Sequence, residues 1–248
     1  MLNKNHEEEI EEFKKYMLEK HGLIRDLTVD SRKDEILFKN ILFVTYLDSL
    51  AACVYPEIPN KERFIRLINR FSHWENRDRV SLGHLAKFVT ITPNPEIEKL
   101  RKYIFSETGN WNNESYISID KDPKIDELKG YEWNPNKATG GKICLEDFKH
   151  SHLLYQTRNS LVHQFQVRGF EFGSTYRPEE PYYERVDKIN AELKFVPDKM
   201  VLIYPVSFLQ KLTETILENV VEYFSESNLN PFPSYYSGEY LLSELNGK

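Results

Sequence analysis

The sequence predicts a mainly α-helical protein with a loop insertion and a small antiparallel β element. Three observations predict this fold class. Apolar residues recur at helical spacing over most of the chain. Residues 107–141 are instead punctuated by Asn, Gly, Pro and Asp. In residues 169–204 the apolar period approaches two, which is typical of strands. We expect one domain, 1–248, because this length supports a single substantial core.

Six helices are expected outside the segment that carries the candidate site. Capping residues, Pro at helix starts and Gly at helix ends mark their boundaries. The helix over 32–54 is apolar on most sides, so we expect it to be buried at the centre of the protein. Lys39, Asn40 and Asp48 interrupt its apolar run, which we interpret as too polar for a membrane span. The other five are expected over 7–20, 61–74, 81–88, 95–106 and 205–225.

The insertion over 107–141 carries four large rings, namely Trp111, Tyr116, Tyr131 and Trp133. Two interpretations stay open. The rings form a lid that offers stacking surfaces to bases, or they pack against the helical body, which is the commoner use of aromatic side chains. In the β element, the run 197–199 (Pro, Asp, Lys) predicts a turn between strands over 191–196 and 200–204.

The composition is ordinary for a soluble globular protein, with 40% hydrophobic and 29% charged residues. A net charge of −6 argues against broad, sequence-blind binding to nucleic acid. Cys53 and Cys144 lie far apart without metal-ligand spacing, so reduced thiols in a cytoplasmic protein are expected. The acidic N-terminal stretch lacks the apolar core of a signal peptide. No cofactor motif and no metal site is indicated.

Residues 145–168 are expected to form one amphipathic helix that carries the candidate site. On an ideal helix Leu154, Leu161 and Phe165 fall within about 40° of one another, which predicts a core-facing stripe. The opposite sector, about 80° wide, carries groups that form directional hydrogen bonds instead of the usual Lys and Glu. These groups are His152, Tyr155, Asn159, His163 and Gln166. A surface helix face of unusual composition is the alternative interpretation.

Arg158, Asn159 and His163 are arranged as Arg, a polar residue, three further residues and His. This pattern resembles the signature of the HEPN superfamily, all-α nucleic-acid-associated domains whose active members are metal-independent endoribonucleases. The resemblance covers the motif helix and, loosely, its partner helices, but not the β-rich segment. It implies a HEPN-like helical bundle in which Arg158, Asn159 and His163 form a catalytic site at a homodimer interface. A toxin or defence role with an antitoxin-like protein partner is a further implication.

Metal-independent RNA cleavage suits these side chains. The imidazole of His163 can act as base or acid near neutral pH. The guanidinium of Arg158 is a permanent cation whose donors match phosphate oxygens. The amide of Asn159 can orient either group. Arg158 and His163 diverge by about 140° on an ideal helix, so we expect a second copy of the helix to bring both groups to one phosphate.

Second-tier substrate-binding candidates lie on the same helix and in a basic stretch. His152 and Tyr155 share the polar face, although structural hydrogen bonding is the alternative for each. Residues 61–79 hold six cationic and three acidic side chains, a net of +3 in an acidic protein. Arg66 and Arg70 represent this stretch as candidate phosphate contacts, against the alternative of a solvated face with ion pairs.

Two other functions remain open. A catalytically inactive HEPN-like interaction or regulatory module would use the same residues to stabilise a dimer, and the acidic net charge favours it. A small-ligand or nucleotide-binding protein would use the aromatic insertion as its pocket.

Overall fold

The computed structural model describes residues 6–165, 179–189 and 195–232, and it divides the chain into two compact units. The helical unit comprises residues 1–73 and 210–248, and the mixed unit comprises residues 74–209. This division is not predicted from the sequence. Among the described residues the protein is mainly α-helical with one small antiparallel sheet, as expected.

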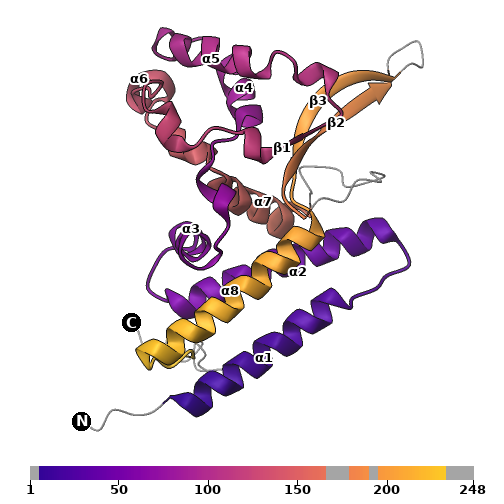
Figure 1. The fold of residues 1–248 in the computed structure, drawn as a ribbon, viewed down its shortest axis with the longest axis vertical. Coiled ribbons are helices and arrows are strands. Elements are labelled where there is room, and N and C mark those ends of the chain that lie inside the picture. Colours follow the sequence, from indigo (N-terminus) through magenta and orange to yellow (C-terminus); the bar gives the residue numbers. More distant parts are fainter. Residues whose placement is uncertain (1–5, 166–178, 190–194, 233–248) are drawn as a thin grey trace, which may run out of the picture. The chain divides into compact units, whose positions relative to one another are not determined.

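The described residues of the helical unit form four helices: α1 (Glu7–Arg25), α2 (Arg32–Val54), α3 (Asn60–Phe71) and most of α8 (Val206–Ser227). α1 and α8 meet where the rings of Phe13 and Phe224 lie edge to face with centroids 5.6 Å apart (Figure 1). The hydroxyl of Tyr46 on α2 donates to the carbonyl oxygen of Met17 on α1 at 3.1 Å. The amide of Asn219 on α8 donates to the carbonyl oxygen of Phe71 at the end of α3 at 2.7 Å.

α1 is longer than the sequence predicts. The pair His21-Gly22 was expected to end the helix near residue 20, but the helix continues to Arg25. His21 is 4% exposed, and its Nε2 lies 3.0 Å from Oγ1 of Thr213 on α8. Packing against α8 therefore outweighs the low helix propensity of Gly22.

α2 begins and ends at the predicted residues, with Oγ of Ser31 accepting from the backbone N–H of Asp34. By length and composition, 34–54 is the one span among the described residues that could cross a membrane, so the expectation that it is too polar is wrong. However, 44% of its most apolar 18-residue window is buried inside the protein. Phe43, Val44 and Leu47 are fully buried, so this part of α2 belongs to the core of the helical unit.

The mixed unit contains α4 (Leu82–Ile91), α5 (Glu98–Thr108), α6 (Pro135–Thr139), α7 (His150–Gln164) and the sheet. The strands are β1 (Tyr116–Ser118), β2 (Tyr182–Ile189) and β3 (Phe195–Ile203), in the order β1-β2-β3 and antiparallel throughout. β1 comes from the predicted insertion and pairs Ile117 with Tyr183 on β2. The sheet therefore joins the predicted insertion to the predicted β element (Figure 1).

The predicted turn at 197–199 is wrong, because these residues lie inside β3. Val186 pairs with Lys199 and Asp187 pairs with Pro197, so the backbone of residue 198 has no partner across the ladder. Such a bulge accommodates proline within a strand, since proline has no N–H to donate. Residues 169–178 and 190–194 of the expected β element lie outside the described residues, and they include most of the strand expected over 191–196.

The rings of the insertion pack against the rest of the mixed unit. This is the structural alternative that the composition left open. Trp133 is 7% exposed, and its indole N–H donates to the carbonyl oxygen of Ile143. The ring pairs are Trp111 with Tyr183 at 4.9 Å, Tyr116 with Tyr182 at 5.6 Å, Tyr131 with Tyr103 at 4.6 Å and Trp133 with Phe88 at 5.1 Å.

Candidate functional site

The motif helix is shorter than predicted. Leu145–Phe148 form a separate 3-10 turn, and Lys149 is extended and bridges to Val80. α7 then runs from His150 to Gln164 and ends because Phe165 adopts a left-handed conformation with φ 51°. The expected residues 166–168, including Gln166, lie outside the described residues.

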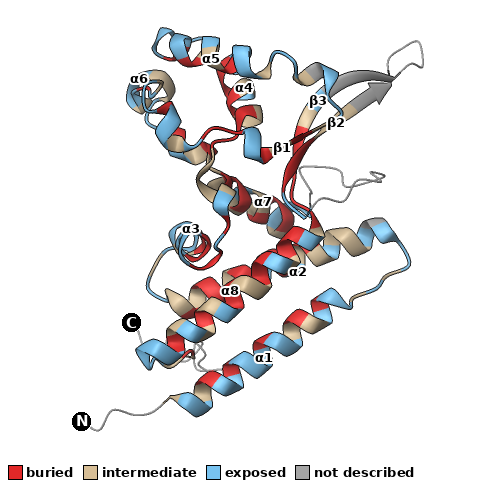
Figure 2. Ribbon diagram, viewed as in Figure 1, coloured by how far each residue is buried: buried red, intermediate tan, exposed pale blue. Residues whose placement is uncertain are grey.

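The predicted apolar stripe is correct for two of its three members. Leu154 is fully buried and Leu161 is 2% exposed, and buried residues extend along most of α7 (Figure 2). Phe165 is 64% exposed, so its assignment to the core is wrong. The physical reason is the helix end, because a residue in the left-handed conformation no longer follows the helical angular spacing.

The structure brings the three motif side chains together within one chain. Nη1 of Arg158 donates to Oδ1 of Asn159 at 3.0 Å and lies 3.4 Å from Nε2 of His163. The long Arg side chain spans the angular difference between positions 158 and 163. The reason for expecting a second copy, namely that one helix does not unite these groups, is therefore wrong. The homodimer itself stays a prediction.

The contact between Arg158 and His163 defines the proton positions. A guanidinium has only donors, so Nε2 of His163 accepts in this contact, and in a neutral imidazole the proton then resides on Nδ1. At 3.4 Å the contact is long for a hydrogen bond. Nε2 is therefore easily released when a stronger acceptor, such as a phosphate oxygen, approaches the guanidinium.

Burial differs sharply across the motif. Arg158 is 9% exposed, Asn159 is half-buried and His163 is exposed in the last turn of α7. The guanidinium of Arg158 therefore lies mostly below the protein surface, whereas the imidazole of His163 lies at the surface. The carbonyl end of a helix carries partial negative charge, so attraction of a phosphate at this position depends on the guanidinium.

No protein-family model, curated protein or solved structure matches the chain. Membership of the HEPN superfamily consequently rests on the motif alone and stays a prediction.

The two second-tier candidates on α7 are partly buried. Nδ1 of His152 lies 3.8 Å from Oδ1 of Asp147, whose other carboxylate oxygen accepts from the backbone N–H of Cys144. This places His152 beside the turn that precedes α7. Tyr155 is half-buried one turn before Asn159.

Arg66 and Arg70 belong to α3 of the helical unit, whereas the motif belongs to the mixed unit. Nη2 of Arg66 donates to the Glu62 carboxylate at 2.5 Å. The guanidinium of Arg70 lies 4.4 Å from the ring centre of Tyr223, and a hydrogen bond to Tyr55 raises its pKa. Both side chains are exposed and are held by neighbours within the unit.

One arrangement was not predicted from the sequence. Nε2 of His150 lies 2.7 Å from Oδ2 of Asp122, and both residues are fully buried. Asp122 lies 28 residues away in the insertion, so only the fold brings the pair together. No group of three or more His, Cys, Asp or Glu in the described part of the chain is arranged to hold a metal ion.

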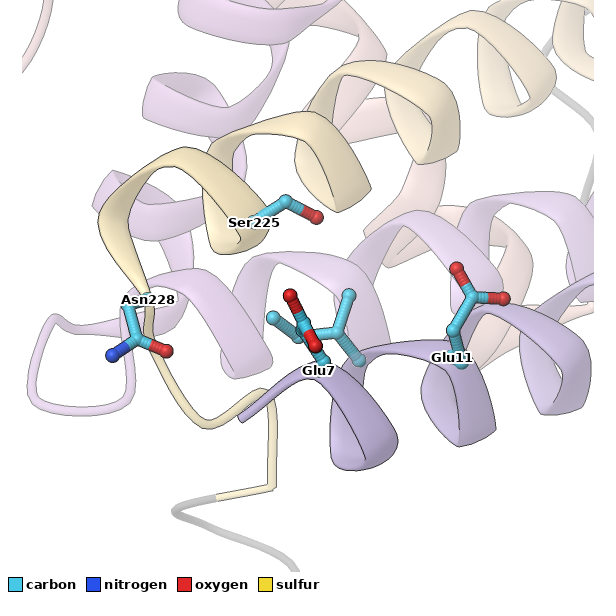
Figure 3. Close-up of a pocket in the computed structure, with 5 residues that line it drawn as sticks. Glu7, Glu11, Ser225 and Asn228 are labelled. Atoms are coloured by element: carbon cyan, nitrogen blue, oxygen red, sulfur yellow. The ribbon is translucent and has the colours of Figure 1, made fainter. Parts of the chain in front are cut away.

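A hollow of about 550 Å³ lies in the helical unit between the first turns of α1 and the end of α8. Glu7 and Glu11 line it from α1, and Ser225 and Asn228 from the other side (Figure 3). The carboxylates make it unsuitable for the phosphate of a nucleic acid, so it is separate from the motif site in chemistry as well as in sequence.

Proposed function

We propose that the protein is a metal-independent endoribonuclease of the HEPN type that acts through Arg158, Asn159 and His163. The observation that carries the proposal is the approach of Nη1 of Arg158 to both Oδ1 of Asn159 and Nε2 of His163. A permanent cation and an imidazole are two of the three groups that cleavage of RNA without a metal requires, and the third is a second group for proton transfer.

In the proposed reaction the ribose 2′-hydroxyl attacks the adjacent phosphorus, and the bond from phosphorus to the 5′ oxygen of the next nucleotide breaks. His163 accepts the proton of the 2′-hydroxyl, and the guanidinium of Arg158 turns from the imidazole to the phosphate oxygens. An acid gives a proton to the departing 5′ oxygen. The products are a 2′,3′-cyclic phosphate and a free 5′-hydroxyl.

A single imidazole serves as base or as acid in one step, but not as both. The His163 of a second copy supplies the missing acid if the motif ends of two α7 helices face one another. The dimer is thus proposed for a second proton-transfer group and not for the meeting of Arg158 with His163. The toxin or defence role and the antitoxin-like partner follow only from the resemblance to the superfamily.

The test of activity is cleavage of mixed RNA in excess chelator. His163→Ala is the most informative variant, since this side chain is exposed and its removal leaves the core intact. We expect a loss of about 10²–10⁴-fold, the usual contribution of a general acid or base. Gln156→Ala, an exposed position on the same helix, is the matched control and should retain full activity.

Mixing wild-type protein with an excess of the His163→Ala variant tests the dimer. If the His163 of a second copy supplies the acid, exchange of subunits pairs most wild-type chains with a variant chain, and cleavage per wild-type chain falls. Unchanged cleavage per wild-type chain would assign catalysis to a single chain and contradict the dimer. Absence of cleavage by the wild-type protein with every RNA would contradict the ribonuclease proposal.

The burial of Arg158 favours a second candidate function. A guanidinium that is 9% exposed and bonded to its own neighbour suits a structural cation. In a catalytically inactive interaction module, the variants would change self-association measured by sedimentation and would have no activity to lose.

A further inference from the structure

Five side chains of the mixed unit form a continuous hydrogen-bond chain, called here the Asp122 network. It runs from His84 through Ser81 and Tyr183 to Asp122 and His150. The distances in this order are 2.8 Å from Nδ1 of His84 to Oγ of Ser81, 2.7 Å to the Tyr183 hydroxyl, 2.6 Å to Oδ2 of Asp122 and 2.7 Å to Nε2 of His150. His84 is the partly exposed end, and the other four residues are almost completely buried.

The proton of every link follows from counting donors. Tyr183 donates its only hydroxyl proton to Asp122, so the Ser81 hydroxyl must donate to Tyr183. Oγ of Ser81 then accepts from Nδ1–H of His84. On the other side the carboxylate accepts from Nε2–H of His150. All donors thus point towards the Asp122 carboxyl group, and they polarise one another in the same direction.

The backbone contributes a further donor at a favourable place. Oδ1 of Asp122 accepts from the N–H of Leu82 at 3.0 Å, at the start of α4. A helix start favours negative charge, so α4 stabilises the buried carboxylate. The guanidinium of Arg79 also donates to the carbonyl oxygen of Asp122. These two contacts hold the fully buried Asp122 in place.

The network joins four segments that are distant in sequence, and one of them is the start of α7. His150 is the first residue of α7, and its backbone is also held. Its N–H donates to the carbonyl oxygen of Arg79 at 3.0 Å, and its own carbonyl oxygen accepts from the Tyr204 hydroxyl at 3.3 Å. The imidazole bond to Asp122 adds the side-chain contact that resists rotation of α7 about its axis.

Nδ1 of His150 is buried and makes no hydrogen bond. A bare ring nitrogen is tolerated there as an unprotonated acceptor, whereas a proton on Nδ1 would be a buried donor without an acceptor. The geometry therefore selects one tautomer, the one that carries its proton on Nε2.

We propose that Asp122 is a positioning residue that holds His150 in the Nε2–H tautomer and thereby fixes the orientation of α7. The insertion over 107–141, which supplies Asp122, then acts as the support of the helix that carries Arg158 and His163. This inference goes beyond the proposed RNA cleavage and does not rest on it.

The test is nitrogen NMR of the histidine rings in the full chain, combined with hydrogen exchange of the α7 amides. In the wild-type protein we expect a proton on Nε2 of His150. In Asp122→Asn the amide nitrogen must take the Oδ2 position, because the backbone N–H of Leu82 still requires an oxygen at Oδ1. Nε2 of His150 then has to accept, and its proton moves to Nδ1, where no partner exists.

A buried N–H of His150 without an acceptor should lower the hydrogen-exchange protection of the α7 amides by about tenfold or more. Ser81→Ala is the matched control, since it removes the outer part of the network and leaves Asp122 bonded to His150. In Ser81→Ala the exchange protection of α7 and the tautomer of His150 should stay unchanged. Only α4 should lose protection, because Ser81 caps its start.

An unprotonated Nε2 of His150 in the wild-type protein overturns the proposal, even if the Asn variant does not fold. Unchanged α7 protection in a folded Asn variant overturns it equally. RNA cleavage is not measured, so failure of the ribonuclease proposal has no bearing on the result.

Discussion

Gly83 lies where a helix and a strand approach too closely for any other residue. A Cβ atom added there would lie 2.8 Å from Cε1 and 3.2 Å from Cδ1 of Tyr183. Trp111 would be the next neighbour, at 3.5 Å. We predict that Gly83→Ala destabilises the mixed unit, although alanine is the better helix former.

Two effects of opposite sign decide the magnitude. Replacing glycine by alanine in a helix stabilises by up to about 1 kcal/mol. Overpacking a filled core costs about 1–3 kcal/mol. The ring of Tyr183 has little freedom to move, because its hydroxyl is bonded to Ser81 and Asp122 and Trp111 packs on its face. We therefore expect a net loss of about 1–2 kcal/mol.

Gly22→Ala is the matched control. Gly22 also lies within a helix, but a Cβ there would meet nothing within 4 Å. The helix-propensity term then acts alone, and we expect a gain of about 0.5–1 kcal/mol in the helical unit.

Urea unfolding followed by two probes separates these effects. The three tryptophans, at 74, 111 and 133, all belong to the mixed unit, so their fluorescence reports on that unit. With a urea dependence of about 2 kcal/mol per molar, Gly83→Ala should lower the fluorescence midpoint by about 0.5–1 M. Circular dichroism reports on both units and should detect the gain from Gly22→Ala. A fluorescence midpoint that is unchanged or raised in Gly83→Ala would show that Tyr183 moves freely, and the reasoning about its fixed hydroxyl would be refuted.

Three further predictions follow from the structure. Burial, together with the Asp122 carboxylate, raises the pKa of Tyr183 and Tyr204 well above 10. The stability that these neutral phenols contribute is complete below pH 10 and is lost as the pH rises towards the folded pKa, so tyrosinate absorbance should show both ionising together with unfolding; early, separate ionisation would contradict their burial. Burial also raises the pKa of the Cys53 and Cys144 thiols to about 11, with the Asp147 carboxylate adding to the effect at Cys144. Each should react with a disulfide reagent about a hundredfold more slowly than in the unfolded chain, and equal rates would be inconsistent with these surroundings. Phe165→Gly should raise the free energy of unfolding followed by fluorescence by about 1 kcal/mol, because glycine adopts the left-handed conformation without strain and the 64% exposed ring has little packing to lose. A lower free energy of unfolding would assign the ring a packing role.

The sequence by itself determined where most helices run. α2 begins and ends at the predicted residues because the capping Ser31 and the Pro after Tyr55 are local signals that act within a few positions. α8 and the burial of Leu154 and Leu161 follow from apolar periodicity for the same reason. The pattern of Arg158, Asn159 and His163 was also visible, since it spans six consecutive positions.

Tertiary structure decided the features that depend on distant partners. α1 passes through Gly22 because His21 meets Thr213, which lies 192 residues away. β3 passes through Pro197 because β2 tolerates a bulge opposite it. The buried pair of Asp122 and His150 has no sequence signal at all, since a carboxylate in an insertion and an imidazole at a helix start become partners only after the chain has folded. Local chemistry acts over one or two turns of chain, whereas burial and pairing depend on which segments the fold brings together.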